Sequence, residues 1–167
     1  RVLNSTNPEC EGSSVVRSDE APGGPKSVAF RSEILFVRIR SSRLEGVTRM
    51  LGKVFAVLYP KRIPVTLAKA TESEVCLVIP EEVDGLAEAF DEIRKWAEVT
   101  VYRDKSFIAV IGRDIVGFEG LGDKVIGFSG KVYMANVGAN MMSESFVIDR
   151  DRLQVTLERL HDYIFEQ

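Results

Sequence analysis

The sequence predicts an α+β fold built from two similar units in tandem, each with an antiparallel sheet and helices on one face. Three observations predict it. Strands and helices alternate from about Glu33 onward, the order of elements repeats with a period near 70 residues, and the two long helices share one apolar spacing. That spacing, i, i+4, i+7 and i+11, places Leu86, Phe90, Ile93 and Ala97 on one helix and Leu153, Leu157, Leu160 and Ile164 on the other. Such a stripe is typical of a helix that lies on a sheet.

The elements follow one order in both units. In the first unit we expect strands at 34–39, 64–68, 74–79 and 99–102 and helices at 50–58 and 83–97. In the second unit we expect strands at 107–111, 131–136 and 144–148 and helices at 121–128 and 151–165, with a loop at 112–120. Ser73-Glu74 and Ser143-Glu144 precede matching strands 70 positions apart. The period is too long for a solenoid, and the order is that of a ferredoxin-like βαββαβ unit.

The first 31 residues differ from the rest. Residues 1–16 form a short leader, and residues 17–31 contain Ala21-Pro22-Gly23-Gly24-Pro25, which predicts a linker or extended turn. We therefore divide the chain into 1–31, a first unit at 32–104 and a second unit at 105–167. Because the first residue is Arg1 rather than Met, we expect a fragment of a longer protein.

The strand at 34–39 is apolar on both faces over residues 34–37. A strand of this kind indicates a sheet that is covered on its second side as well. Either the other unit or a partner chain can provide that cover. This pattern is our reason to expect oligomers.

Composition excludes several classes of function. The 167 residues carry a net charge of −3, so no broad basic surface for nucleic acid is expected. No run approaches the roughly 20 apolar residues of a membrane helix. Cys10 and Cys76 are far apart, which indicates reduced thiols in an intracellular protein and neither a disulfide framework nor a metal site. The single histidine, His161, lies in a helical pattern with no nucleophile beside it.

Catalytic motifs are missing as well. No P-loop occurs, and a dinucleotide fingerprint placed on Gly120 and Gly122 fails because Val125 stands at the third glycine. A small ligand fits better, since the free amides at the start of a helix suit a carboxylate, as in the loops 44–51 and 113–121. Thr66 and Glu74 could accept an ammonium group. We therefore expect no catalytic residue and a small-molecule ligand.

Two stretches resemble one family. The leader, with Asn4-Ser5-Thr6-Asn7-Pro8 and Gly12-Ser13, is similar to the segment that ends the kinase lobe of aspartate kinases. The second unit, from Phe107 through Gly138-Ala139 to Leu160-His161 and Phe165, resembles the last ACT domain of that family. The tandem units as a whole look like the paired ACT domains of its C-terminal regulatory region.

The resemblance implies a regulatory fragment without kinase activity or a cofactor of its own. ATP and Mg would bind in an upstream lobe of the parent, which carries a Lys-Phe-Gly-Gly strand that is absent here. The parent would phosphorylate aspartate on the route to lysine, threonine, methionine and isoleucine, in the cytoplasm. The fragment would bind an end-product amino acid such as lysine or threonine for feedback control. It would also form a homodimer through its ACT units.

The resemblance also implies an effector site in the first unit, in three short segments. They comprise Thr48, Arg49, Met50 and Leu51, then Pro64, Val65 and Thr66, and finally Ser73, Glu74 and Val75. Two positions depart from the family, in which Gly-Phe is frequent at Arg49-Met50 and an aspartate is frequent at Thr66. A second ligand or a contact between units could use Asn136, Gly138, Ala139 and Asn140, for which a plain hairpin turn is the alternative.

Two other functions stay open. The pocket could be lost through Arg49 and Thr66, which would leave a dimerisation module without an effector site. An RNA-binding or enzymatic use of the ferredoxin-like fold is less well supported. Phe107 and Tyr133 are isolated aromatic candidates on the sheet, and the net charge has the wrong sign for RNA.

Overall fold

A computed structural model describes residues 23–165, so the leader at 1–16 lies outside the described residues. The strands are β1 (Gly24–Arg40), β2 (Leu67–Ala70), β3 (Glu74–Pro80), β4 (Glu98–Arg113), β5 (Val132–Asn136) and β6 (Ser143–Asp149). The helices are α1 (Val47–Leu58), α2 (Leu86–Arg94), α3 (Leu121–Ser129) and α4 (Leu153–Phe165), with short 3-10 turns η1 (Ile115–Gly117) and η2 (Arg150–Arg152). The six strands form one antiparallel sheet in the order β2-β3-β1-β4-β6-β5.

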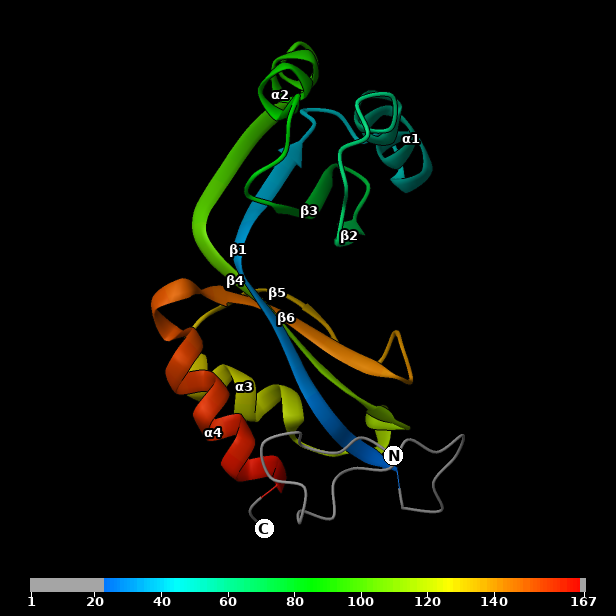
Figure 1. The fold of residues 1–167 in the computed structure, drawn as a ribbon. Helices are drawn as coiled ribbons and strands as arrows, with labels where there is room; N and C mark the ends of the chain where they lie inside the picture. Colours follow the sequence, from blue (N-terminus) through cyan, green and yellow to red (C-terminus); the bar gives the residue numbers. More distant parts are fainter. Residues whose placement is uncertain (1–22, 166–167) are drawn as a thin grey trace, which may run out of the picture.

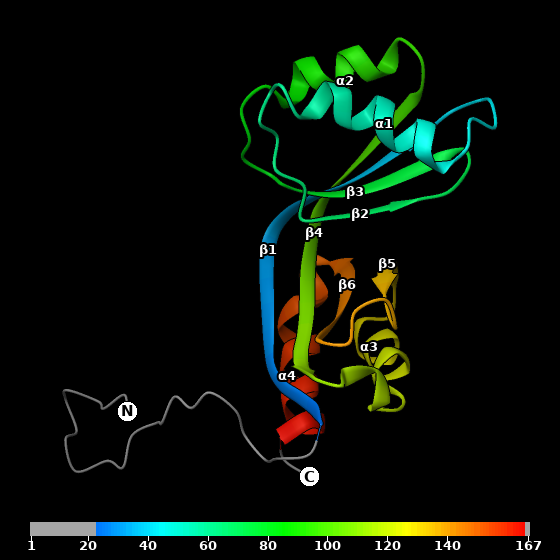
Figure 2. The same cartoon turned by 90° about the vertical axis from the view of Figure 1, so that its right-hand side faces the viewer.

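The two long strands β1 and β4 run through the whole molecule and pair with each other along most of their length (Figures 1 and 2). The pairing of β1 with β3 is confined to residues 34–40, and that of β4 with β6 to residues 105–111. The sheet therefore has two halves. The first half contains β2, β3 and the adjoining parts of β1 and β4, under α1 and α2. The second half contains β5, β6 and the other parts of β1 and β4, against α3 and α4.

Residues 24–31, which we expected in a linker, form the beginning of β1. They pair with the end of β4, from Gly24 opposite Arg113 to Arg31 opposite Phe107. Among the described residues this part of β1 is an edge strand with a register shift after Pro25, and edge strands and irregularities are where sheets tolerate proline. A Cβ on Gly112 would collide with the backbone of Gly24, so glycine permits the close approach. The segment supplies a fourth strand to the second half, which the sequence did not reveal.

The expected strands at 99–102 and 107–111 are likewise one continuous strand, β4. It changes direction near Asp104, which has a positive φ of 54°. The pairing of β1 with β4 shifts register between Arg31 and Ile34 and again before Phe36. Irregularities of this kind bend a strand pair. Both long strands therefore bend between the halves (Figure 2).

The core has three parts. One lies under α1 and α2, and a second lies under α3 and α4. The third lies between the inner faces of the two halves, where Ile34, Phe36 and Val78 of the first half belong to one cluster with Met134 and Val147 of the second. The other half of the same chain therefore covers the second apolar face of β1, and this pattern alone requires no partner chain.

The repeated Ser-Glu pair does not occupy equivalent places in the two halves. The N–H of Ser41 donates to the carbonyl of Ser73 at 2.8 Å, and at the corresponding place in the second half the N–H of Gly112 donates to Met142 at 3.0 Å. By this register Glu144 stands where Val75 stands in the first half. Alternation along a strand then turns the side chain of Glu144 toward the helices, where it is buried.

Candidate functional site

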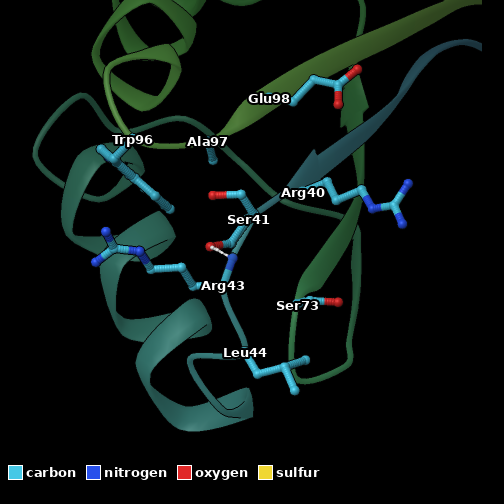
Figure 3. A pocket seen from close by; sticks show the side chains of 9 residues that line it. Arg40, Ser41, Arg43, Leu44, Ser73, Trp96, Ala97 and Glu98 are labelled. Carbon is cyan, nitrogen blue, oxygen red and sulfur yellow. Dashed lines mark hydrogen bonds between the residues drawn. The ribbon is translucent and has the colours of Figure 1, made fainter.

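A hollow of about 540 Å³ lies at the end of the first half, where β1 ends and β4 begins (Figure 3). Three segments line it: the chain that leaves β1, the turn between β2 and β3, and the chain that enters β4. Its lining residues are Arg40, Ser41, Ser42, Arg43, Leu44, Ser73, Trp96, Ala97 and Glu98. The hollow is large enough for an amino-acid-sized ligand and is open to solvent.

Backbone hydrogen bonds fix the first two segments to each other. Besides the bond between Ser41 and Ser73, the N–H groups of Glu45 and Gly46 both donate to the carbonyl of Glu72, at 3.1 and 3.2 Å. The Arg43 N–H donates to the hydroxyl of Ser41 at 3.1 Å, within the loop (Figure 3). The rim of the hollow is therefore largely formed before any ligand binds.

Glu45 connects this loop to helix α1. Its carboxylate accepts a hydrogen bond from Lys53 Nζ at 2.9 Å and lies 3.3 Å from the guanidinium of Arg49. The hydrogen bond from Lys53 is the largest cause of the lowered pKa of Glu45. Lys53 Nζ also lies 4.0 Å from the centroid of the Trp96 ring. One ammonium group thus joins the loop to the tryptophan that lines the hollow.

The charges around the hollow suit a zwitterion. Trp96 and Arg43 lie on one side of Ser41, whereas Arg40 and Glu98 lie on the other, with their charged groups directed away from Ser41 and Trp96 (Figure 3). A guanidinium binds a carboxylate through two parallel hydrogen bonds, and a carboxylate such as that of Glu98 accepts from an ammonium group. A serine hydroxyl can donate to the carboxylate of a ligand or accept from its ammonium group. The rim therefore carries residue types that can recognise a free α-amino acid, with both signs of charge present.

Helix α1 carries four residues of the effector site that the family resemblance implies. Thr48 and Arg49 are exposed on its first turn, and Arg49 pairs with Glu45 at the surface rather than lining the hollow. Met50 is fully buried in the core, and Leu51 packs against that core. Of these four, Thr48 and Arg49 are exposed, Leu51 is partly exposed and Met50 is inaccessible to a ligand.

The second predicted segment lies away from the hollow. Pro64 and Thr66 are exposed just before β2, and Val65 packs on the core. The N–H of Thr66 donates to the carbonyl of Val78 at 2.8 Å. Because the four residues of β2 span about 13 Å, the structure does not bring this segment beside Ser73, which follows the other end of β2.

The three residues of the third predicted segment lie in three different environments. Ser73 lines the hollow, and Val75 is fully buried in the core. Glu74 points to the inner face of the sheet, where its Oε2 lies 2.7 Å from Arg38 Nη2. The hydrogen bond from Arg38 lowers the pKa of Glu74, and the same bond raises the pKa of Arg38.

The sequence analysis missed most of the residues that line the hollow. Trp96 lies in the connection between α2 and β4, and Glu98 is the first residue of β4, both 55 or more positions beyond Ser41. Only the order of strands in the sheet shows that the two connections meet. The one available signal was that Trp96 is the only tryptophan of the chain.

The four residues proposed for a second site lie at the turn between β5 and β6. Asn140 fixes this turn, since its Oδ1 accepts from the N–H of Met142 at 2.9 Å and its Nδ2 donates to Ser143 Oγ at 3.0 Å. Gly138 has a φ of 74°, which glycine adopts freely. Asn136 ends β5, and Ala139 is exposed. None of the four lines the hollow in the first half.

The described part of the chain gives little support for a metal site, a membrane span or an RNA-binding surface. Within residues 23–165, no three side chains of the metal-binding types are grouped as a metal would need. No helix there has both the length and the apolar character to cross a membrane. Phe107 and Tyr133, the two aromatic candidates for RNA, pack in the cluster between the halves.

Known proteins similar to this chain are aspartokinases. The chloroplastic aspartokinase 3 of Arabidopsis thaliana is 28% identical over 182 residues, which cover 99% of this chain and 32% of that protein. The chloroplastic aspartokinase 1 of the same plant is 24% identical over 185 residues, covering 99% of this chain and 31% of that protein. The resemblance to aspartate kinases is confirmed. No family model matches the chain.

Solved structures of aspartate kinases share the fold. Escherichia coli aspartokinase III in complex with lysine and aspartate matches 90% of this chain and 35% of its own, with a TM-score of 0.76 and 23% identity. The regulatory subunit of aspartate kinase from Thermus thermophilus matches 85% of this chain and 99% of its own, with a TM-score of 0.67 and 14% identity. The chain spans about a third of the length of its curated relatives and nearly the whole length of that regulatory subunit.

Proposed function

We propose that this chain is the regulatory region of an aspartate kinase and that it binds an end-product amino acid such as lysine or threonine. The parent protein would phosphorylate aspartate with ATP and Mg, both bound in the kinase lobe. The aspartokinase relatives support the parent activity. The observation that carries the sensing function is the hollow, with guanidinium groups, a carboxylate and serine hydroxyls around a tryptophan wall.

We propose further that the two halves are two ACT units. In chain order the first half reads β1-α1-β2-β3-α2-β4, and its spatial order β2-β3-β1-β4 is that of a ferredoxin-like unit. The second half repeats that order with the end of β4 as its first strand and the start of β1 as its fourth. We propose the boundaries 32–104 and 105–167 for these units and add residues 24–31 to the second, because this segment pairs with the end of β4.

The regulation would be a shift in populations. An effector changes activity only if it binds one arrangement of the regulatory units better than another, by an amount equal to the coupling free energy. The exposed positions Thr48, Arg49, Pro64 and Thr66 remain candidates for ligand contacts at a boundary between two copies in a homodimer. A dimerisation module without a working effector site is the second candidate, because Arg49 and Thr66 replace the residues that are frequent in the family.

The first experiment is thermal unfolding of the chain with lysine, threonine, methionine and isoleucine in separate samples. A ligand at 100 times its dissociation constant stabilises the folded state by about 2.7 kcal/mol, which is a shift in Tm of roughly 5–10 °C for a chain of this length. Trp96 fluorescence should change with the same amino acid, since the ring lines the hollow. A shift with one amino acid and not the others identifies the effector.

The test variant is Ser42→Ala, which removes a hydroxyl from the rim, and its control is Ser27→Ala in β1 of the second half. Only the first should weaken the response. If no amino acid changes either the Tm or the fluorescence, and sedimentation shows a constant dimer, the dimerisation module replaces the sensor. If the complete parent protein consumes no ATP in the presence of aspartate, the kinase assignment is wrong.

A further inference from the structure

A second hollow, the inner cleft, lies between the two halves on the inner faces of the sheet, with a volume of about 380 Å³. The first half contributes side chains of β1, β3 and β4, and the second half contributes β5 and the residue before it. The lining residues are Phe36, Arg38, Glu74, Cys76, Tyr102, Lys131, Val132 and Tyr133. The inner cleft shares no lining residue with the hollow that we propose for the effector.

Cations stand on both sides of the inner cleft. From the first half, Arg38 is held by Glu74, whose two oxygens lie 3.3 and 2.7 Å from Nε and Nη2. Glu74 thus takes two of the five donors of the guanidinium and fixes its orientation. From the second half, Lys131 Nζ lies 4.4 Å from the centroid of the Tyr133 ring. With two cations and one carboxylate, the lining is positive in a chain of net charge −3.

Three aromatic rings form an apolar wall between these cations. The ring centroids of Phe36, Tyr102 and Tyr133 are 5.6 to 6.0 Å apart, so the rings pack against one another. The hydroxyl of Tyr133 donates to Asp149 at 2.9 Å, which holds this ring in place. Such a wall suits a short aliphatic segment, and cavities of this size with a few fixed polar groups are typical ligand sites.

We propose that the inner cleft binds a small dicarboxylate. One carboxylate would accept hydrogen bonds from Arg38 and the other from Lys131, while the methylene groups between them contact the aromatic wall. A monocarboxylate can satisfy only one of the two cations. Because the two cations belong to different halves, the bound ligand would join the halves and favour the arrangement seen here. The inner cleft and the effector hollow share no lining residue, although a smaller pocket lined by Arg38, Arg40, Glu74, Glu98, Thr100 and Tyr102 lies between them. The dicarboxylate proposal does not depend on the function of the effector hollow.

The test is a titration of the full chain with succinate at constant ionic strength, followed by calorimetry and by amide chemical shifts. Constant ionic strength matters because added salt alone screens exposed charges. We expect saturable binding, with the largest shifts at Cys76, Tyr102 and Tyr133. The variant Lys131→Gln should bind about tenfold more weakly, since it loses one charge-assisted contact. The control Lys95→Gln, an exposed lysine after α2, should bind as the unchanged chain does.

Four results would overturn the proposal, of which three concern succinate alone. These three are a linear response without saturation, an equal loss of affinity in both lysine variants, and shifts centred outside the inner cleft. Acetate should bind much more weakly than succinate, and equal affinity also counts against a two-carboxylate ligand. Trp96 lies in the effector hollow and not in the inner cleft, so its fluorescence should stay constant with succinate. This readout separates the proposal from the amino-acid response, and either can fail alone.

Discussion

The buried carboxyl of Glu144 should destabilise the chain at neutral pH, and its replacement by valine should stabilise it. Glu144 lies on β6 opposite Val110, is 4% exposed, and has an Oε2 with no hydrogen-bond partner among the described residues. An unsatisfied buried polar group costs about 1–3 kcal/mol. Valine already fills the equivalent position, Val75, in the first half. Glu144→Val should therefore raise the Tm by roughly 2–12 °C.

The pH dependence gives a second measurement on the same residue. Burial raises the pKa of Glu144, so the folded state holds this proton more tightly than the unfolded chain does. Glu144 therefore contributes most to the free energy of unfolding in acid. This contribution is lost as the pH rises from the pKa of an unfolded glutamate, about 4.3, through the raised pKa of the folded state. We expect the gain from Glu144→Val to be larger at pH 8 than at pH 4.

The assay is thermal unfolding of the unchanged chain, Glu144→Val and Glu144→Gln at both pH values. The exposed Glu119→Gln serves as the control and should shift the Tm at neither. Glu144→Gln should remove the pH dependence while keeping much of the desolvation cost. Destabilisation by Glu144→Val at pH 8, or a gain that does not change with pH, would refute the reasoning.

Three further measurements test the description of the fold. Met50→Ala should reduce the free energy of unfolding in urea by about 2–5 kcal/mol, because the side chain is fully buried, and an unchanged stability would contradict its place in the core. Gly112→Ala should abolish hydrogen-exchange protection in the first part of β1, whereas Gly127→Ala, which meets no atom within 4 Å, should not. Burial raises the pKa of Cys76 to about 11, so in a Cys10→Ser background its alkylation at pH 8 should be far slower than in urea; equal rates would exclude a shielded thiol.

Local patterns predicted the elements whose structure depends on nearby residues. The stripe of Leu153, Leu157 and Leu160 requires only the helical period and one apolar surface, and α4 follows it. The fourth strand of the second half was missed for the opposite reason. Gly24 and Pro25 carry local turn signals, and their strand conformation depends on pairing with residues near Gly112, almost 90 positions later. Only this non-local pairing determines that the segment is a strand.

The candidate site shows the same limit. The sequence located the loop after β1 and the turn at Ser73, because both precede recognisable elements. It could not place Trp96 and Glu98 beside them, since this neighbourhood arises from the sheet order β3-β1-β4. The Ser-Glu repeat also did not mark equivalent positions, because the two pairs differ by one residue in their place along the strand. A strand has a side-chain period of two, so a shift of one residue sends Glu74 to the inner face and Glu144 to the helices.

The shared strands constrain how a ligand at the hollow could affect the second half. Arg40 ends β1 and Glu98 begins β4, so the hollow lies at the ends of the two strands that continue into the other half. The halves cannot separate freely, because Ile34 and Val147 are fully buried between them. Opening would expose this apolar cluster at a cost of about 25 cal/mol for each Å². A ligand-driven change in this fold should therefore use small sliding of the inner faces, with the cluster kept intact, rather than a hinge that opens them.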